Sequence, residues 1–288
     1  MGARAARIAG RGALSDLLPD APAKPTPVIL GILNLSPESF SDGGKYSEPA
    51  VALAHATHLV AEGADVIDVG AAASNAAAPT ISPAAELGRL DPVVSELMRA
   101  GTAVSIDSAS PEVQRHGLDL GVAYLNDVSG FGDEALYPRL AAAQTKLIVV
   151  HTLTGARAAP RDTRPGEIMA SLQRFFDGRI AELTKAGVAR ERIILDPGMG
   201  LFLGSGAGPS IEALRGLPAL RARFGLPILV SVSRKSFLGD ITGRPVAERA
   251  AGTLAAELYA IDAGADYVRT HAPGALRDAL AVSRALRG

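Results

Sequence analysis

Short aliphatic runs recur along the chain, and each of them ends on a polar side chain. Residues 28–33 lead into Asn34, and Ile193, Ile194 and Leu195 lead into Asp196. Runs of this length, bounded by turn-forming residues, are typical of buried β-strands. The pattern predicts eight strands, over residues 28–34, 65–70, 103–107, 123–127, 146–151, 192–196, 227–232 and 266–271.

Segments with helical periodicity separate the predicted strands. Residues 49–62 form one of them, with apolar side chains three and four positions apart. A glycine precedes several strands, as Gly63 and Gly264 do, at the place where a left-handed helix cap is expected. Strands that alternate with helices imply parallel pairing with right-handed crossovers.

Eight such strand–helix units predict an α/β fold, a (β/α)8 TIM barrel formed by residues 28–288 as one domain. An open, doubly wound sheet is the alternative. That fold normally carries a Gly-x-Gly-x-x-Gly turn after its first strand, and this sequence does not. Residues 1–27, rich in Ala, Arg and Pro, are expected to form an N-terminal arm or a cap on the barrel.

The amino-acid composition argues against several classes of binding partner and of catalytic chemistry. The 288 residues carry 29 Lys and Arg against 30 Asp and Glu, a balance that argues against nucleic acid as a partner. Cysteine is absent, which excludes thiolate catalysis, disulfides and Cys-ligated zinc. No apolar run is long enough to span a bilayer and the start lacks a signal-peptide core, so we expect a cytoplasmic protein with no membrane partner.

In a barrel the polar strand ends all meet at one face, where enzymes of this fold place their active sites. Asp107, Asn126 and Asp196 can exchange hydrogen bonds in one plane, which suits the edge of a flat nitrogen heterocycle. Asn34, Arg269 and His271 suit an anionic group such as a phosphate. Two further strand ends, Asp68 and Asp127, are interpreted equally well as turn caps or interior hydrogen-bonding groups.

Six motifs occur in the order and spacing of one known family. They are the stretch from Asn34 to Gly44, Ser105-Ile-Asp107, Asn126-Asp-Val-Ser-Gly130, Leu195-Asp-Pro-Gly198, Ser233-Arg-Lys-Ser236 and Arg269-Thr-His271. Together they resemble dihydropteroate synthase, over residues 28 to the end. The resemblance implies a pterin-binding TIM barrel. It also implies a folate-pathway reaction, in which 7,8-dihydropterin-6-ylmethyl diphosphate and 4-aminobenzoate give dihydropteroate and pyrophosphate.

The resemblance also implies roles for individual residues. Asp42, Lys235 and Arg269 are the expected catalytic residues, with Asp42 stabilising the pterin cation from the first loop. The pterin pocket is expected to comprise Asp107, Asn126, Asp196 and Lys235. The pyrophosphate end is expected to comprise Asn34, Arg269 and His271, with the cofactor Mg2+ at Asn34. The 4-aminobenzoate wall is expected to comprise Leu201, Phe202, Lys235 and Ser236.

The second loop departs from the common family pattern. Where the family has a sequence like Gly-Glu-Ser-Thr-Arg-Pro, this chain has Gly70-Ala-Ala-Ala-Ser-Asn-Ala76. Here and in several other motifs the chain is more similar to the mobile, sulfonamide-insensitive branch. A reshaped wall near Met199, Leu201 and Phe202 would admit the flat substrate and exclude the bulkier sulfonyl tail of a sulfonamide. We therefore expect sulfonamide resistance.

Three alternative functions are kept open. A corrinoid-linked methyltetrahydrofolate methyltransferase also resembles a pterin-binding barrel, but has no need of the Ser-Arg-Lys-Ser and Arg-Thr-His motifs. A non-catalytic pterin-binding paralogue is motivated by the altered second loop, and a Schiff-base aldolase using Lys235 is a third option. A helix predicted over residues 246–262 carries an apolar stripe that barrel packing explains, while the resemblance implies a homodimer through the late helices.

Overall fold

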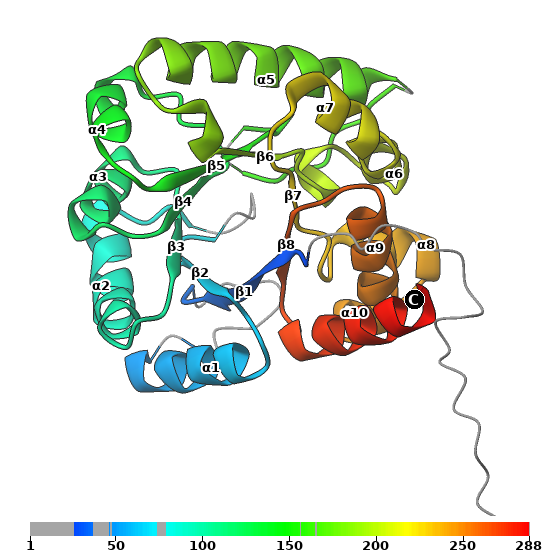
Figure 1. Ribbon diagram of the computed structural model, residues 1–288, viewed down its shortest axis with the longest axis horizontal. Helices are drawn as coiled ribbons and strands as arrows, with labels where there is room; N and C mark the ends of the chain where they lie inside the picture. Colours follow the sequence, from blue (N-terminus) through cyan, green and yellow to red (C-terminus); the bar gives the residue numbers. More distant parts are fainter. Residues whose placement is uncertain are drawn as a thin grey trace, which may run out of the picture.

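The computed structural model describes residues 26–36, 46, 48–73, 79–155, 157–164 and 166–287. Eight parallel strands form its centre (Figure 1). They are β1 (Val28–Asn34), β2 (Val66–Gly70), β3 (Val104–Asp107), β4 (Tyr124–Asp127), β5 (Lys146–Val150), β6 (Ile193–Asp196), β7 (Leu229–Val230) and β8 (Tyr267–Thr270). All eight strands predicted from the sequence are confirmed, with ends within two residues.

The sheet closes into a barrel. Hydrogen bonds connect the strands in the order β6-β5-β4-β3-β2-β1-β8-β7. The two ends of this order meet through a parallel bridge between Leu195 and Ile228, supported by a 2.9 Å hydrogen bond from the Leu195 amide to the Pro227 carbonyl. The predicted TIM barrel is therefore confirmed.

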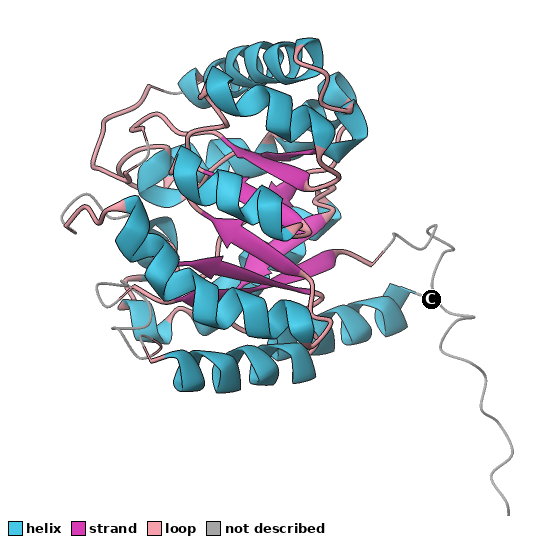
Figure 2. Cartoon of the chain, turned by 90° about the vertical axis from the view of Figure 1, so that its left-hand side faces the viewer, coloured by secondary structure: helices cyan, strands magenta, loops and turns pink. Residues whose placement is uncertain are grey.

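Helices surround the strands as an outer layer (Figure 2). They are α1 (Pro49–Ala61), α2 (Pro83–Arg99), α3 (Pro111–Leu120), α4 (Tyr137–Ala142), α5 (Glu167–Lys185), α6 (Gly208–Arg215), α7 (Leu217–Phe224), α8 (Ser236–Thr242), α9 (Ala250–Asp262) and α10 (Pro273–Arg287). The helix predicted over residues 246–262 is wrong at its start. Val246–Glu248 forms a separate 3-10 turn, and the non-helical backbone of Arg249 divides it from α9.

Glycines end the helical segments as the sequence predicts. Six of them, each shortly before a strand, have a positive φ, which residues other than glycine rarely adopt. They are Gly63, Gly101, Gly121, Gly187, Gly225 and Gly264. In every case the chain turns from a helix into the next strand, so these glycines set the alternation that builds the barrel.

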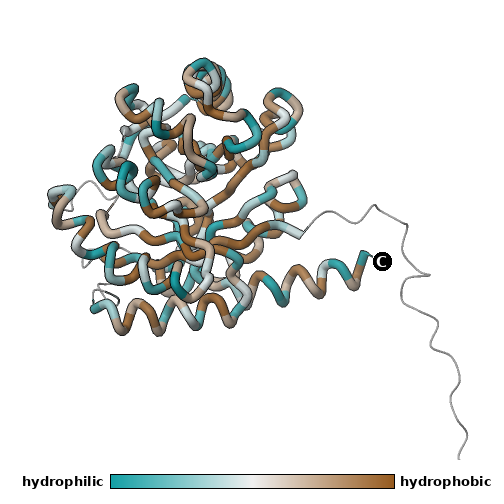
Figure 3. Tube along the Cα trace, turned by 60° about the vertical axis from the view of Figure 1, so that its left-hand side comes forward, coloured by the Kyte–Doolittle hydropathy of each residue, from teal (hydrophilic) through white to brown (hydrophobic). Residues whose placement is uncertain are grey.

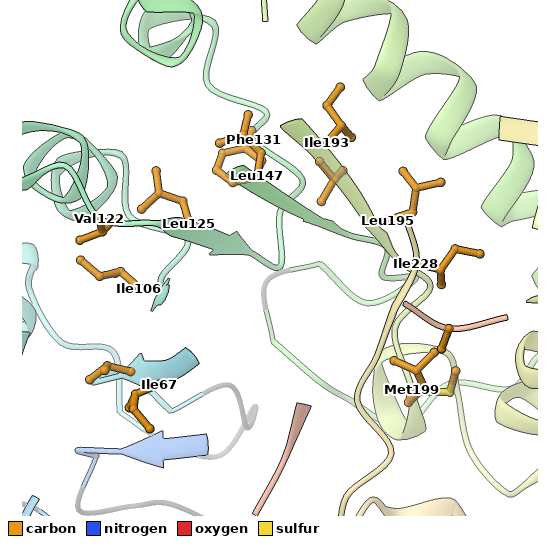
Figure 4. Close-up of a cluster of buried hydrophobic side chains, with 14 of the residues drawn as sticks. Ile67, Ile106, Val122, Leu125, Phe131, Leu147, Ile193, Leu195, Met199 and Ile228 are labelled. Carbon is orange, nitrogen blue, oxygen red and sulfur yellow. The ribbon is translucent and has the colours of Figure 1, made fainter. Parts of the chain in front are cut away.

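Alternating residues of each strand serve two cores. Outward side chains such as Ile67, Leu125 and Ile193 join the large cluster that packs strands against helices (Figure 4). A second cluster draws residues from seven different strands, which places it inside the barrel. Its members are Leu30, Val66, Tyr124, Ile148, Val150, Ile194, Leu229 and Tyr267. Figure 3 shows the resulting concentration of hydrophobic residues along the strands.

Three predictions concern residues that lie wholly or mostly outside the described ranges. The proposed N-terminal arm lies outside the described residues except for Thr26 and Pro27, and the Thr26 hydroxyl accepts a hydrogen bond from Arg284 of α10. Asp42 and the second-loop residues Ser74 and Asn75 also lie outside them.

Across the described ranges, no helix combines the length and apolar character needed to cross a bilayer.

Candidate active site

The polar strand ends open into one pocket of about 550 Å³. This volume is in the usual range for a site that encloses a small molecule. The pocket wall contains every described residue assigned to the site from the sequence: Asn34, Asp107, Asn126, Asp196, Leu201, Phe202, Lys235, Ser236, Arg269 and His271. The structure therefore brings together residues from β1, β3, β4, β6 and β8 and from the loops after β6 and β7.

The strand period explains why these side chains face inward. Successive inward positions on a strand are two residues apart. Tyr124 lies in the interior apolar cluster, and Asn126 lines the pocket on the same strand. Ile194 and Asp196 repeat this arrangement on β6. The pocket floor is therefore the polar continuation of the barrel core.

Arg269 lies at the centre of the charged wall. Its Nη2 donates a 2.6 Å hydrogen bond to Asp107 Oδ2, and its Nε donates to Asp68 Oδ2. The Arg269 side chain is 14% exposed and the Asp107 side chain 29%, whereas Asp68 is completely buried. The two carboxylates hold the guanidinium in the protonated form and raise its pKa, although burial alone would lower it.

Burial makes the pocket carboxyl groups weaker acids than free aspartate. It raises the pKa of Asp107 to about 7, against the opposing charge of Arg269. It also raises the pKa of Asp196 to about 6, opposed by a 2.8 Å hydrogen bond from the Gly198 amide to Asp196 Oδ1. Both groups therefore change charge close to neutral pH.

Lys235 faces these carboxylates from the loop after β7. Burial and the nearby charge of Arg269 lower the pKa of its ammonium group to about 8, while Asp196 and Asp107 oppose this shift. Its Nζ lies 5.0 Å from the centroid of the Phe202 ring, within the range of a cation–π contact. The lysine is thus held between an anionic wall and an aromatic ring.

The turn that presents Lys235 is strained and is held by residues at the start of α9. Arg234 has a φ of 58°, a left-handed conformation that is uncommon for a residue with a side chain. Arg249 Nη1 donates to the carbonyl oxygens of Arg234 (3.1 Å) and Lys235 (3.3 Å), and Thr253 Oγ1 accepts from the Arg234 amide (3.1 Å). These contacts preserve a backbone shape that local sequence alone does not favour.

The residue before this turn, Ser233, orients His271. The Ser233 hydroxyl lies 2.8 Å from His271 Nδ1, and the same oxygen accepts from the His271 backbone amide at 3.3 Å. Both residues line the pocket, as Arg269 does, and His271 follows Arg269 by two positions in the chain. The Ser-Arg-Lys-Ser and Arg-Thr-His motifs therefore meet at one wall.

Two other strand ends support the backbone and do not line the pocket. Asp127 accepts 2.7 Å hydrogen bonds from the Ser129 and Phe131 amides, and so caps its own turn. The His151 ring contacts Ser171 Oγ at 2.9 Å and the Pro197 carbonyl at 3.3 Å, and burial lowers its pKa to about 4. His151 is therefore neutral at physiological pH and holds the loop after β6.

Comparison with known proteins assigns this architecture to a family. Residues 30–271 match the family described as pterin binding enzyme. Dihydropteroate synthase type-2 of Escherichia coli is 50% identical over 260 residues, covering 90% of this chain and 96% of the relative. The chain belongs to the dihydropteroate synthases. The type-3 enzyme of E. coli is 48% identical over 259 residues, covering 90% of this chain and 98% of the relative.

Solved structures of dihydropteroate synthases share the fold. The Coxiella burnetii enzyme in complex with pteroic acid superimposes with a TM-score of 0.82 at 32% identity, over 92% of this chain and 95% of that one. The Xanthomonas albilineans enzyme with 4-aminobenzoic acid gives 0.81 at 33%, over 91% and 93%. The Yersinia pestis enzyme in a sulfonamide drug complex gives 0.84 at 28%, over 97% and 98%.

In this dihydropteroate synthase, three residues that support the pocket are not identifiable from the sequence alone. The sequence allows two interpretations of Asp68 and indicates no role for Arg249 or Thr253. Arg249 and Thr253 are 14 to 19 positions from the backbone atoms they hold, so no local motif marks them. Asp68 carried a local signal, its place at a strand end, but that signal is identical for Asp127.

Proposed function

We propose that this protein is an active dihydropteroate synthase. It joins 7,8-dihydropterin-6-ylmethyl diphosphate to 4-aminobenzoate and releases pyrophosphate. The observation that carries the proposal is a single pocket in which a wall of carboxylates and an amide faces a wall of cations. That pocket occurs in a chain half identical to a named dihydropteroate synthase over nearly its whole length.

The pterin end is formed by Asp107, Asn126, Asp196 and Lys235. A pterin presents an amidine-like edge of donors and acceptors, which carboxylate and amide groups in one plane can match. Asp196 is suited to this role because the Gly198 amide fixes one of its oxygens, at 2.8 Å. Lys235 adds a donor and partly compensates the charge of the buried carboxylates.

The leaving group lies against Asn34, Arg269 and His271. Arg269 supplies a guanidinium whose planar donors match phosphate oxygens. The described residues contain no cluster of three or more His, Asp or Glu that could form an all-protein metal cage. The Asn34 amide oxygen is nonetheless a suitable ligand for Mg2+, which usually takes few protein ligands and completes its shell with water and phosphate oxygens. Bound Mg2+ supplies further charge stabilisation for the pyrophosphate.

The reaction needs positioning more than it needs a strong base. The bond between the pterin methylene carbon and the diphosphate oxygen breaks, and its electron pair leaves with pyrophosphate. The aromatic amine is already neutral at pH 7, so it can attack the methylene carbon and then lose a proton. Arg269 stabilises the developing negative charge, and the buried carboxylates hold the ring in place. The assignment of Asp42 to the pterin cation stays a prediction.

The 4-aminobenzoate end is formed by Leu201, Phe202, Lys235 and Ser236. Phe202 is 8% exposed and its ring lies under the Lys235 ammonium, so this part of the wall is fixed. A flat aminobenzoate can lie along such a wall, whereas the bulkier tail of a sulfonamide meets it. We therefore propose that the enzyme is sulfonamide-insensitive and would confer sulfonamide resistance.

We also propose a homodimer, assembled through the late helices. Four large apolar side chains are exposed there: Ile241 on α8, Tyr259 on α9, and Val282 and Leu286 on α10. The three helices are neighbours in Figure 1. Light scattering should give twice the chain mass, and a monomer would contradict the proposal. The cytoplasmic location stays a prediction of the sequence.

Product analysis separates this function from its rivals. The protein is incubated with the pterin diphosphate, 4-aminobenzoate and Mg2+, and dihydropteroate is sought by mass spectrometry. Dihydropteroate formation supports the proposal. Tight binding of the pterin diphosphate without product favours the non-catalytic paralogue that the altered second loop motivates. Methyl transfer from methyltetrahydrofolate, or a borohydride-trapped adduct on Lys235, would favour the methyltransferase or the aldolase.

A further inference from the structure

One carboxylate behind the pocket contacts both functional walls. Asp68, on β2, is completely buried and is absent from the pocket lining. It accepts a hydrogen bond from Arg269 Nε and longer contacts of 3.4 and 3.5 Å from Asn126 Nδ2. We propose that Asp68 is a positioning residue that couples the pterin end of the site to the diphosphate end, an inference that rests on the proposed function.

Asp68 fixes the orientation of the Asn126 amide. An ionised carboxylate only accepts hydrogen bonds, so the amide must direct its NH2 group at Asp68. The Asn126 oxygen is then directed away from Asp68, on a side chain that lines the pocket. Asp68 thereby determines that Asn126 offers the ligand an acceptor, as a donor edge of a pterin requires.

Asp68 also anchors Arg269 while another contact changes. In the described structure Arg269 Nη2 donates to Asp107, the carboxylate assigned to the pterin. A diphosphate offers this guanidinium a stronger partner, since bidentate contacts to phosphate are favourable. The arginine exchanges Asp107 for the diphosphate and keeps its Nε on Asp68. Asp107 is then released for the pterin ring, so binding at each end strengthens binding at the other.

The charges of the cluster support this exchange. Arg269 and Lys235 face three carboxylates, Asp68, Asp107 and Asp196, and the charge of Asp68 adds to the raised pKa of Asp107. Without Asp68, Asp107 would be the principal counter-ion of Arg269. It would hold the guanidinium more firmly, and its pKa would fall.

The first test compares Asp68→Asn with Asp65→Asn. Asp65 lies three residues earlier, just before β2, and accepts from the Ile29 amide (2.7 Å) and Arg277 Nη2 (2.7 Å). It therefore controls for the removal of a carboxylate on the same part of the chain that also pairs with an arginine. Calorimetry measures the affinity of each variant for 6-hydroxymethyl-7,8-dihydropterin and for its diphosphate.

The preference for the diphosphate over the alcohol should fall at least about tenfold in Asp68→Asn, because an ionic hydrogen bond that positions Arg269 is lost. The acidic limb of diphosphate binding should also move to lower pH, following Asp107. Asp65→Asn should keep the wild-type preference and the wild-type limb. A merely structural Asp68 would lower the melting temperature and move neither readout. Unchanged preference in a folded Asp68→Asn protein overturns the proposal.

A second measurement uses the wild type and does not depend on the variant folding. Crystal structures are determined without ligand and with the pterin diphosphate. Arg269 Nε should contact Asp68 in both, while Nη2 moves from Asp107 to the diphosphate. An arginine that leaves Asp68, or that keeps Asp107, overturns the proposal. Because both readouts are binding, absence of turnover alone counts against the proposed function and not against Asp68, whereas a wild type that binds neither compound overturns both.

Discussion

The barrel interior has two layers, built from the same strands but with opposite chemistry. The lower layer is apolar and includes Tyr124 and Ile194. The upper layer begins two residues later on β4 and β6, with Asn126 and Asp196. On β6 the two layers are almost equally buried: Ile194 is 1% exposed and Asp196 5%. These two positions therefore differ in what burial does to the side chain, and not in how much water it contacts.

Burial stabilises the lower layer and destabilises the upper one. Removing an aliphatic side chain from water favours folding. Removing a carboxylate from water disfavours its ionised form, which is why the pKa of Asp196 rises to about 6. We infer that the lower layer stabilises the barrel. The upper layer lowers the free energy of unfolding and in return provides a site of defined charge.

The largest effect is expected from Asp196→Asn in the polar layer. An amide cannot supply two acceptors, so one buried group of the pterin loses its partner, and kcat/KM should fall by about a thousandfold. Steady-state kinetics measure this loss. Wild-type kinetics in Asp196→Asn would remove Asp196 from the pterin pocket.

The raised pKa of Asp196 also predicts the direction in which Asp196→Asn changes the stability of the folded protein. A carboxyl whose pKa is raised in the folded state stabilises the protein when protonated, and this contribution is lost as pH rises through the folded value of about 6. At pH 8 Asp196→Asn should therefore melt at or above the wild-type temperature, and the difference should disappear near pH 4. A lower melting temperature at pH 8 would contradict the inference that this layer is destabilising.

The matched change in the lower layer is Ile194→Ala, two residues earlier on β6. It leaves a cavity in the apolar cluster and should cost about 3 kcal/mol in the free energy of unfolding. Because Ile194 does not line the pocket, kcat/KM of the folded protein should stay within about twofold of wild type. Denaturant unfolding and kinetics at low temperature measure both quantities. A large kinetic loss with little change in stability would reverse the roles of the two layers.

A smaller effect is expected from pH. The pKa values of Asp107, Asp196 and Lys235 are about 7, 6 and 8. Affinity for the pterin diphosphate should be greatest between pH 7 and 8. It should decline by about tenfold at pH 6 as Asp107 takes up a proton, and decline again above pH 8 as Lys235 loses its charge. Titration calorimetry measures the profile. Asp107→Asn should lose the limb near pH 7, and a profile that is flat from pH 6 to 9 would contradict these ionisations.

The smallest expected effect concerns the aromatic wall. Phe202→Ala removes the ring beneath Lys235 and opens the 4-aminobenzoate end. Inhibition by sulfamethoxazole should strengthen by about fivefold, whereas the KM for 4-aminobenzoate should change less, because the flat substrate needs no extra room. Inhibition constants and KM are measured in the same assay. Equal changes for drug and substrate would show that Phe202 does not discriminate between them.

The fold could be predicted from the sequence because aliphatic runs of strand length alternate with segments of helical periodicity. Aliphatic runs marked the strands, glycines such as Gly121 marked the helix ends, and the barrel topology then placed residues as distant as Asn34 and Arg269 at one face. Every described residue assigned to the site lines the pocket. Their individual roles stay predictions.

What the sequence did not reveal depends on contacts between distant residues. Asp68 and Asp127 stand at equivalent strand ends, yet Asp127 is satisfied within four residues and Asp68 by Arg269, 201 positions away. The helix start was misplaced because the residues around Arg249 are compatible with a helix. In the structure the helix is instead interrupted at Arg249, whose side chain donates hydrogen bonds to the carbonyl oxygens of Arg234 and Lys235.

Pyrophosphate release tests whether the polar layer of the barrel carries out dihydropteroate synthesis. Pyrophosphate release is followed with the pterin diphosphate, Mg2+ and 4-aminobenzoate, for wild type, Ile194→Ala and Asp196→Asn at a temperature where all three are folded. We predict 4-aminobenzoate-dependent release by wild type and Ile194→Ala at similar rates, and almost none by Asp196→Asn. No release by wild type, or equal release by all three proteins, would contradict the assignment of dihydropteroate synthesis to the polar layer of the barrel.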